Sequence, residues 1–137
     1  MAYAEALRTI TLDADSSIGV FTGPPGYPGS ADPNNGKQYC FVKITGRHQA
    51  GLCTNATNEL CEGVLQNKPQ HTGEAATVAR SGVSLIQLGA TLADGVAVKS
   101  SATGTAVAAT LGTDTVLGVL TIGGASGSLG SVSLRVS

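Results

Sequence analysis

Charged residues are scarce in this chain of 137 residues, where they make up 12% of the sequence. Soluble domains usually carry about 25%. From Ser81 onward the charged side chains are Asp94, Lys99, Asp114 and Arg135. Two explanations stay open: a surface made polar by Ser and Thr, or a surface that meets other subunits, because charged residues are depleted at interface cores.

Three further absences narrow the classes of function. The net charge is −1 and basic residues form no stripe, which argues against a nucleic-acid partner. No apolar run reaches the roughly 18 residues of a membrane-spanning helix. Residues 1–8 lack the basic and apolar regions of a secretory leader. We therefore expect synthesis in a cytoplasm and no membrane partner.

The sequence also lacks the motifs of metal and cofactor sites. It contains no CxxC, HExxH, GxGxxG or GxxxxGK[ST] pattern. Cys53 with His48 or His71 is formally a nucleophile pair, but nothing marks an oxyanion hole or an orienting group. The sequence predicts no metal, no cofactor and no enzyme activity.

Three cysteines, an odd number, and the missing leader favour reduced thiols in this chain. A disulfide between Cys53 and Cys61 stays open as the alternative. The spacing of these two residues does not match a zinc knuckle.

The chain is rich in sequence patterns that are typical of β-strands and turns. Short runs of Val, Ile, Leu and Thr alternate with Gly, Asp, Asn and Ser at about the 8–12-residue spacing of small barrels and sandwiches. Glycines fall too often for helices, since each costs about 1 kcal/mol inside one. The sequence predicts an all-β fold, a small β-barrel-like or sandwich-like domain, with one short helix left open near 55–61.

Individual strands and turns can be assigned from local patterns. Residues 38–45 predict a strand with Cys40, Val42 and Ile44 on one face, because successive side chains alternate. Residues 116–122 predict a strand buried on both faces, and residues 131–136 a half-buried one. Turns are expected at 94–95, where Asp-Gly favours a tight turn, at 102–104, and in the glycine-rich loop 123–130.

We divide the chain into an N-terminal arm and loop, 1–36, and a β-barrel-like domain, 37–137. Residues 9–12 are β-prone and either add a strand to the sheet of another protein or form the first strand of this one. Four prolines and four glycines in 22–36 exclude regular structure, which leaves a binding loop or a solvated insertion. All five aromatic residues lie within the first 41 positions, as interface anchors or as core.

An ordered set of segments between residues 62 and 137 carries a family resemblance. It comprises GVLQNKP (63–69), GEAATV (73–78), SGVS (81–84), GATLADGVAV (89–98), AVAA (106–109) and GVL (118–120). The set resembles the capsid decoration, or cement, proteins encoded in the head gene clusters of tailed phages. The resemblance covers about residues 38–137, and residues 13–36 depart from it.

The resemblance implies a virion protein on the outer capsid surface. Such a protein would bind the major capsid protein at junctions between subunits of the mature expanded head, stabilise the shell, and form a homo-oligomer, with a trimer favoured. Tyr3, Leu7, Ile10 and Leu12 are the predicted capsid contacts. The alternative is a head-fibre or tail-associated β-module that binds host surface glycans. A small cysteine hydrolase is the third class.

Overall fold

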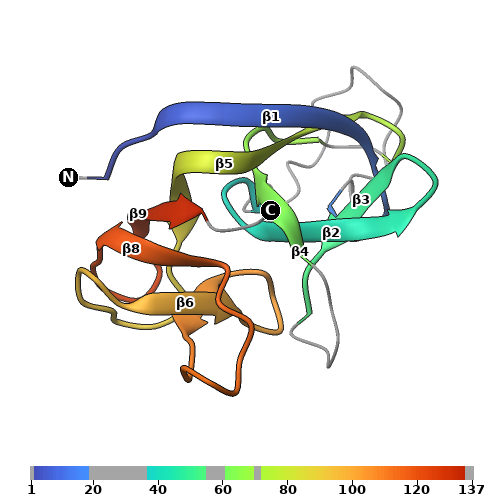
Figure 1. Cartoon of the computed structure of the whole chain (residues 1–137). Helices are drawn as coiled ribbons and strands as arrows, with labels where there is room; N and C mark the ends of the chain where they lie inside the picture. Colours follow the sequence, from blue (N-terminus) through green and yellow to red (C-terminus); the bar gives the residue numbers. More distant parts are fainter. Residues whose placement is uncertain (1, 19–36, 55–60, 70–71, 135–137) are drawn as a thin grey trace.

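The computed structural model describes residues 2–18, 37–54, 61–69 and 72–134. In these ranges the chain is all-β, as predicted, and nine strands form one sheet (Figure 1). The strands are β1 (Glu5–Ala14), β2 (Phe41–Gly46), β3 (Gln49–Leu52), β4 (Cys61–Leu65), β5 (Ala75–Gln87), β6 (Ala97–Ser100), β7 (Ala106–Ala108), β8 (Gly118–Ile122) and β9 (Leu129–Leu134). The predicted loop at 22–36 lies outside the described residues. So does the short helix left open near 55–61, except for Cys61, which begins β4.

Strand β1 closes five strands into a ring. It pairs in parallel with β3 through Asp13 and Ala14, and antiparallel with β5 over Thr9 to Asp13. Because β3, β2, β4 and β5 are already neighbours in that order, the two pairings of β1 complete the circuit. Of the two roles left open for residues 9–12, the structure has the second: they belong to the first strand of this protein's own sheet.

Strand β5 joins the ring to the rest of the sheet. Its first half pairs with β1 and β4, and its residues 83–87 pair with residues 129–133 of β9. From β9 the sheet continues through β8 and β6 to β7. Figure 1 shows β6, β8 and β9 below β1 and β5, with β2, β3 and β4 to one side. With 13 residues, β5 is long enough to pair with strands of the ring and with β9.

The buried side chains form two hydrophobic clusters. Because successive side chains of a strand point to opposite faces, neighbouring residues can belong to different clusters. In β2 Phe41 and Val42 are adjacent and both fully buried, and in β4 the same holds for Val64 and Leu65. Val42 and Leu65 join the ring cluster, completed by Leu12, Ala14, Ile18, Ala50, Ala76 and Val78. Phe41 and Val64 join a second cluster with residues of β6 to β9. The ring and the outer strands therefore pack as two layers, which confirms the sandwich-like prediction.

The predicted turns are present. Gly95 adopts a φ of 83° in the turn at 94–95 that leads into β6, a value that glycine accepts without steric cost. Residues 102–104 connect β6 to β7, and residues 123–128 connect β8 to β9. Leu92 and Gly124 exchange backbone hydrogen bonds of 2.9 and 2.8 Å, so two of these turns lie side by side.

Two predictions about burial were wrong. In β8 Gly118 and Leu120 are buried but Thr121 is exposed, so this strand is covered on one face rather than two. Ile44, expected beside Val42, is 48% exposed, because it lies near the turn that ends β2 and beyond the buried part of the ring. Strand β9 is confirmed within 131–134, and residues 135–137 lie outside the described ranges.

Candidate interaction surface

The four predicted capsid contacts occupy different environments. Tyr3 is 39% exposed, whereas Leu12 is 6% exposed and belongs to the ring cluster. Leu7 and Ile10 are half-buried, and each packs against one of the two clusters. We therefore correct the expectation for Leu12, whose side chain fills this protein's own core. Tyr3 is the member of the four that lies on the surface.

Leu7 and Ile10 of β1 pack against different clusters, in agreement with their separation of three positions. Regular alternation would place them on opposite faces of β1. The pairing of β1 with β5 also shifts on both sides of Arg8. Gly82 of β5 lies opposite this shift with a φ of +97°.

The N-terminal segment is fastened to β9 through one serine. The backbone N–H of Tyr3 donates to Oγ of Ser131, and that hydroxyl donates to the carbonyl oxygen of Tyr3 at 2.8 Å. Ser131 is fully buried beneath the segment. A buried hydroxyl is tolerated when it is hydrogen-bonded, so this pair fixes where Tyr3 lies. The alternating pattern of β9 gives no sign of this contact.

The loop between β7 and β8 carries the most exposed large apolar side chain of the described residues. Leu111 is 74% exposed. The loop projects at the bottom of Figure 1, away from β1 and the N-terminus. Sequence reasoning missed Leu111, because a leucine within a Thr-Leu-Gly-Thr-Asp turn does not reveal which way it points.

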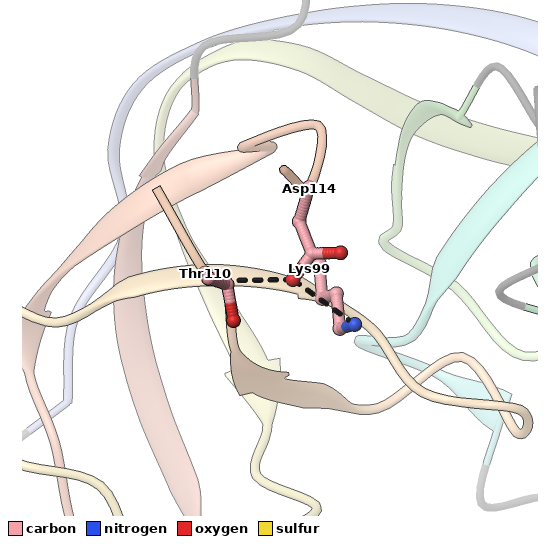
Figure 2. A network of polar contacts seen from close by, with 3 residues as sticks. All are labelled: Lys99, Thr110 and Asp114. Atoms are coloured by element: carbon pink, nitrogen blue, oxygen red, sulfur yellow. Dashed lines mark hydrogen bonds and ion pairs between the residues drawn. The ribbon is translucent and has the colours of Figure 1, made fainter. Parts of the chain in front are cut away.

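Asp114 makes two polar contacts that tie this loop to itself and to β6 (Figure 2). Its Oδ2 accepts a hydrogen bond of 2.7 Å from the backbone N–H of Thr110 and lies 3.1 Å from Nζ of Lys99. The Thr110 N–H, followed by Lys99, lowers the pKa of Asp114. A lowered pKa means that the stabilisation is present above the ordinary value of 3.8 and is lost as the pH falls through the lowered one. The contacts therefore hold at neutral pH.

The cysteines differ from the expected reduced thiols, because Cys53 and Cys61 form a disulfide. Strands β3 and β4 pair with opposite edges of β2, and their facing ends place the two Cα atoms 6.4 Å apart. Cys40 is buried, and burial raises its pKa to about 11 against a smaller opposing effect of Lys37. Its thiol is therefore protonated at neutral pH, and Cys53 is not available as the nucleophile of the Cys–His pair.

Reduction of this disulfide is expected to lower the free energy of unfolding by about 2–3 kcal/mol, because the bond closes a short loop and restricts the unfolded chain. The two cysteines are 8 positions apart. Urea unfolding followed by circular dichroism, with and without reductant, measures the effect. The Cys61→Ser variant should start at the lower stability and not respond to reductant. An equal response of wild type and variant would contradict the assignment.

Neither metal ligands nor a membrane-spanning helix emerge from the described parts of the chain. Residues 2–18, 37–54, 61–69 and 72–134 contain no group of three or more His, Cys, Asp or Glu side chains placed to hold a metal ion. Within the same ranges no helix has the length and apolar character needed to cross a bilayer. His71, one of the two histidines considered above, lies outside these ranges.

Together the fold and the surface define an all-β module with few charges, a fastened N-terminal segment and one projecting apolar loop. Its fold is similar to that of a solved phage structure, the N base of head fiber gp8.5 in bacteriophage phi29. The match has a TM-score of 0.63, 17% sequence identity and 96% coverage of both chains. No family model and no curated protein matches the sequence. The resemblance to decoration proteins therefore rests on the segments quoted above.

Proposed function

We propose that this chain is a structural protein of a tailed-phage head that decorates the outside of the mature, expanded shell. The observation that carries the proposal is the match to the base of a head fiber, which runs over nearly the whole of both chains. The ordered segments in β4 to β8 that resemble decoration proteins support the same location. The major capsid protein is the proposed partner, at junctions between its subunits.

A decoration role fits the physical character of the surface. Charged residues make up 12% of the chain, and a low charge suits a surface that packs against other subunits. A protein that binds the expanded shell and not its precursor stabilises the expanded state by mass action. The gain is about 2.7 kcal/mol per site when its free concentration is 100 times the dissociation constant.

A second candidate is the base of a head fibre, with binding to host glycans elsewhere in the assembly. The specific observation that favours it is that the protein of similar fold is itself the base of a head fiber. Both candidates place this module on the head. They differ in whether the bound module stabilises the shell or serves to mount a fibre that recognises a host.

Co-sedimentation with undecorated expanded heads and with unexpanded procapsids tests the location. We expect saturable binding to expanded heads at a fixed copy number, and little binding to procapsids. The two candidates are then separated by heating DNA-filled heads with and without the bound protein. A decoration protein should raise the temperature at which the heads release DNA, whereas a fibre base need not. Light scattering on the unbound protein tests the proposed trimer. Absence of binding to either shell would reject both candidates and lead to glycan arrays.

The proposal includes no catalytic step. The three cysteines, which are the nucleophiles considered from the sequence, support this: two form the disulfide, and burial keeps the third protonated. Replacing all three with Ser is expected to leave head binding intact in the fraction of protein that folds. Loss of binding in folded protein would count against this part of the proposal.

A further inference from the structure

The part of the sheet that follows Ser81 presents one face away from both hydrophobic clusters. Along residues 83–87 of β5 and along β6 to β9, buried residues alternate with less buried ones. The buried apolar residues, such as Ile86 and Leu120, belong to the cluster that contains Phe41. The residues between them form the opposite face, which we call the outer face. Its aliphatic members are Val83, Leu85, Ala97, Val107, Val119 and Leu129.

These aliphatic side chains form a continuous surface. Val83 of β5 lies opposite Ser133 of β9, which in turn lies opposite Val119 of β8. Val119 also lies opposite Ala97 of β6. Directly opposite residues have Cβ atoms about 5 Å apart on one face of the sheet, so this row crosses four strands. None of the six aliphatic side chains belongs to either hydrophobic cluster. Leu129 is 43% exposed, and the other five are half-buried.

Charge is almost absent from the centre of the outer face. Along these described strands the face contains one charged side chain, Lys99, whose Nζ lies 3.1 Å from the carboxylate of Asp114. Unpaired charge begins at the edge, where the exposed Glu5 of β1 lies opposite Val83. An apolar centre with a polar rim is the usual composition of a protein interface.

Three uncharged polar side chains of the outer face already have partners within the chain. Oγ1 of Thr121 donates to the carbonyl oxygen of Ser131 at 3.3 Å. Nε2 of Gln87 donates to the carbonyl oxygen of Gln38 at 2.7 Å. Ser131 is fully buried although it lies on this face, because Tyr3 of the N-terminal segment bonds to its hydroxyl. These three side chains therefore need no polar partner from another surface.

This composition indicates a face that another protein covers. An antiparallel sheet with one face in water normally places polar side chains there, whereas the outer face places aliphatic ones. Most charged residues of the chain lie before Ser81, outside this part of the sheet. Contiguous exposed apolar surfaces mark interaction sites. Permanent interfaces between identical subunits are more apolar than those of transient complexes.

We propose that the outer face packs against other copies of this chain and forms the contact within the trimer. This inference rests on the proposed function, which favours a trimer, and adds the surface that holds it together. Around a three-fold axis each copy meets two others, so every outer face finds an uncharged partner of the same chemistry. The capsid protein is a poorer occupant. A decoration protein remains in solution until the shell has expanded, and an uncovered apolar face would promote aggregation during that time.

Two lysine substitutions separate the outer face from the rest of the surface. Val119→Lys places a charge in the middle of the row that crosses four strands. Ile44→Lys is the matched control, because it also replaces a β-branched side chain of a strand with lysine. Ile44 is 48% exposed and lies on β2, outside the outer face. Sedimentation equilibrium of the free full-length protein over a range of concentrations measures the mass of each assembly.

Wild type and Ile44→Lys are expected to sediment as trimers. Val119→Lys is expected to raise the concentration at which half of the protein is dissociated by about 100-fold or more, because an unpaired charge is costly to bury. The melting temperature of wild type should rise with protein concentration, as it does when folding and association are linked. Circular dichroism identifies any variant that fails to fold. Leu129→Lys, on the same face at the start of β9, then replaces Val119→Lys.

Failure of this inference differs from failure of the proposed function. A wild type that stays monomeric at all concentrations would overturn the inference, and so would a folded Val119→Lys that associates as wild type does. Equal dissociation of Ile44→Lys would also overturn it. If Val119→Lys remains a trimer but no longer binds expanded heads, the capsid protein occupies the outer face instead. If wild type binds no shell while Val119→Lys dissociates the trimer, the head role fails and the inference stands.

Discussion

Replacing Phe41 with Ala is expected to lower the free energy of unfolding by about 3–5 kcal/mol, the usual cost of truncating a buried aromatic residue. Phe41 is the largest of the fully buried side chains in the described residues. It lies in the cluster between the ring and the outer strands, so its loss leaves a cavity at the junction of the two layers. Domains of this size have about 5–15 kcal/mol in total, and the variant should therefore be marginally stable.

The backbone around Phe41 explains why neighbouring segments should respond together. Its N–H donates to the carbonyl oxygen of Gly104 at 2.7 Å, and its carbonyl oxygen accepts from the N–H of Cys53 at 3.0 Å. The residue thus joins β2 to the β6–β7 turn and to the end of β3. Urea unfolding monitored by circular dichroism measures the change.

Tyr3→Ala is the control for Phe41→Ala, because it removes an aromatic side chain from the surface. Its hydrogen bonds to Ser131 come from the backbone and survive the substitution. Surface substitutions usually change stability by less than about 0.5 kcal/mol. A loss below about 1 kcal/mol for Phe41→Ala would mean that the junction repacks without a cavity.

Local features of this chain could be read from the sequence because they depend on neighbouring residues. The turn at Asp94 and Gly95 follows from backbone preferences of those two residues. The β-rich fold follows from frequent glycines and β-branched residues. The sequence also placed β9 approximately, because Val132 and Leu134 alternate with serines.

Features that depend on distant residues could not be read in this way. The ring closes when β1 meets β5, more than sixty positions along the chain, and no local pattern encodes that partner. The burial of Ser131 depends on the N-terminal segment that lies across it. The outward direction of Leu111 depends on Asp114 and on β6. Of the exposed apolar side chains, the sequence analysis named Tyr3 as a contact and did not name Leu111.

Gly82→Ala is expected to lower the free energy of unfolding by about 2–5 kcal/mol, the sum of two costs. A left-handed φ costs an alanine about 1–2 kcal/mol, and Gly82 has a φ of +97°. Its new Cβ would also approach the carbonyl oxygen of Ala6 within 2.4 Å and that of Glu5 within 2.8 Å. These are backbone atoms that cannot rotate away, so β1 must move, and such overpacking costs about 1–3 kcal/mol more.

Gly73→Ala separates the two costs. Gly73 has a nearly equal φ of +92°, but a Cβ there would meet nothing within 4 Å, so this variant should lose about 1–2 kcal/mol from backbone strain alone. The difference between the two losses of stability is then the steric cost of placing a Cβ against the backbone of β1 at the register shift. Equal losses of stability would mean that β1 accommodates the Cβ at position 82 without a steric cost.

The hydrogen-exchange rates of backbone amides can show which residues are displaced by Gly82→Ala. Exchange should rise for amides of residues 5–8 and for the N–H of Tyr3, while residues 9–13, paired with β5 beyond the shift, keep their protection. Because Tyr3 is held by Ser131 at the far end of this segment, release of residues 5–8 would also free the exposed Tyr3. If Tyr3 contacts the shell, Gly82→Ala should then weaken head binding, and Gly73→Ala should not.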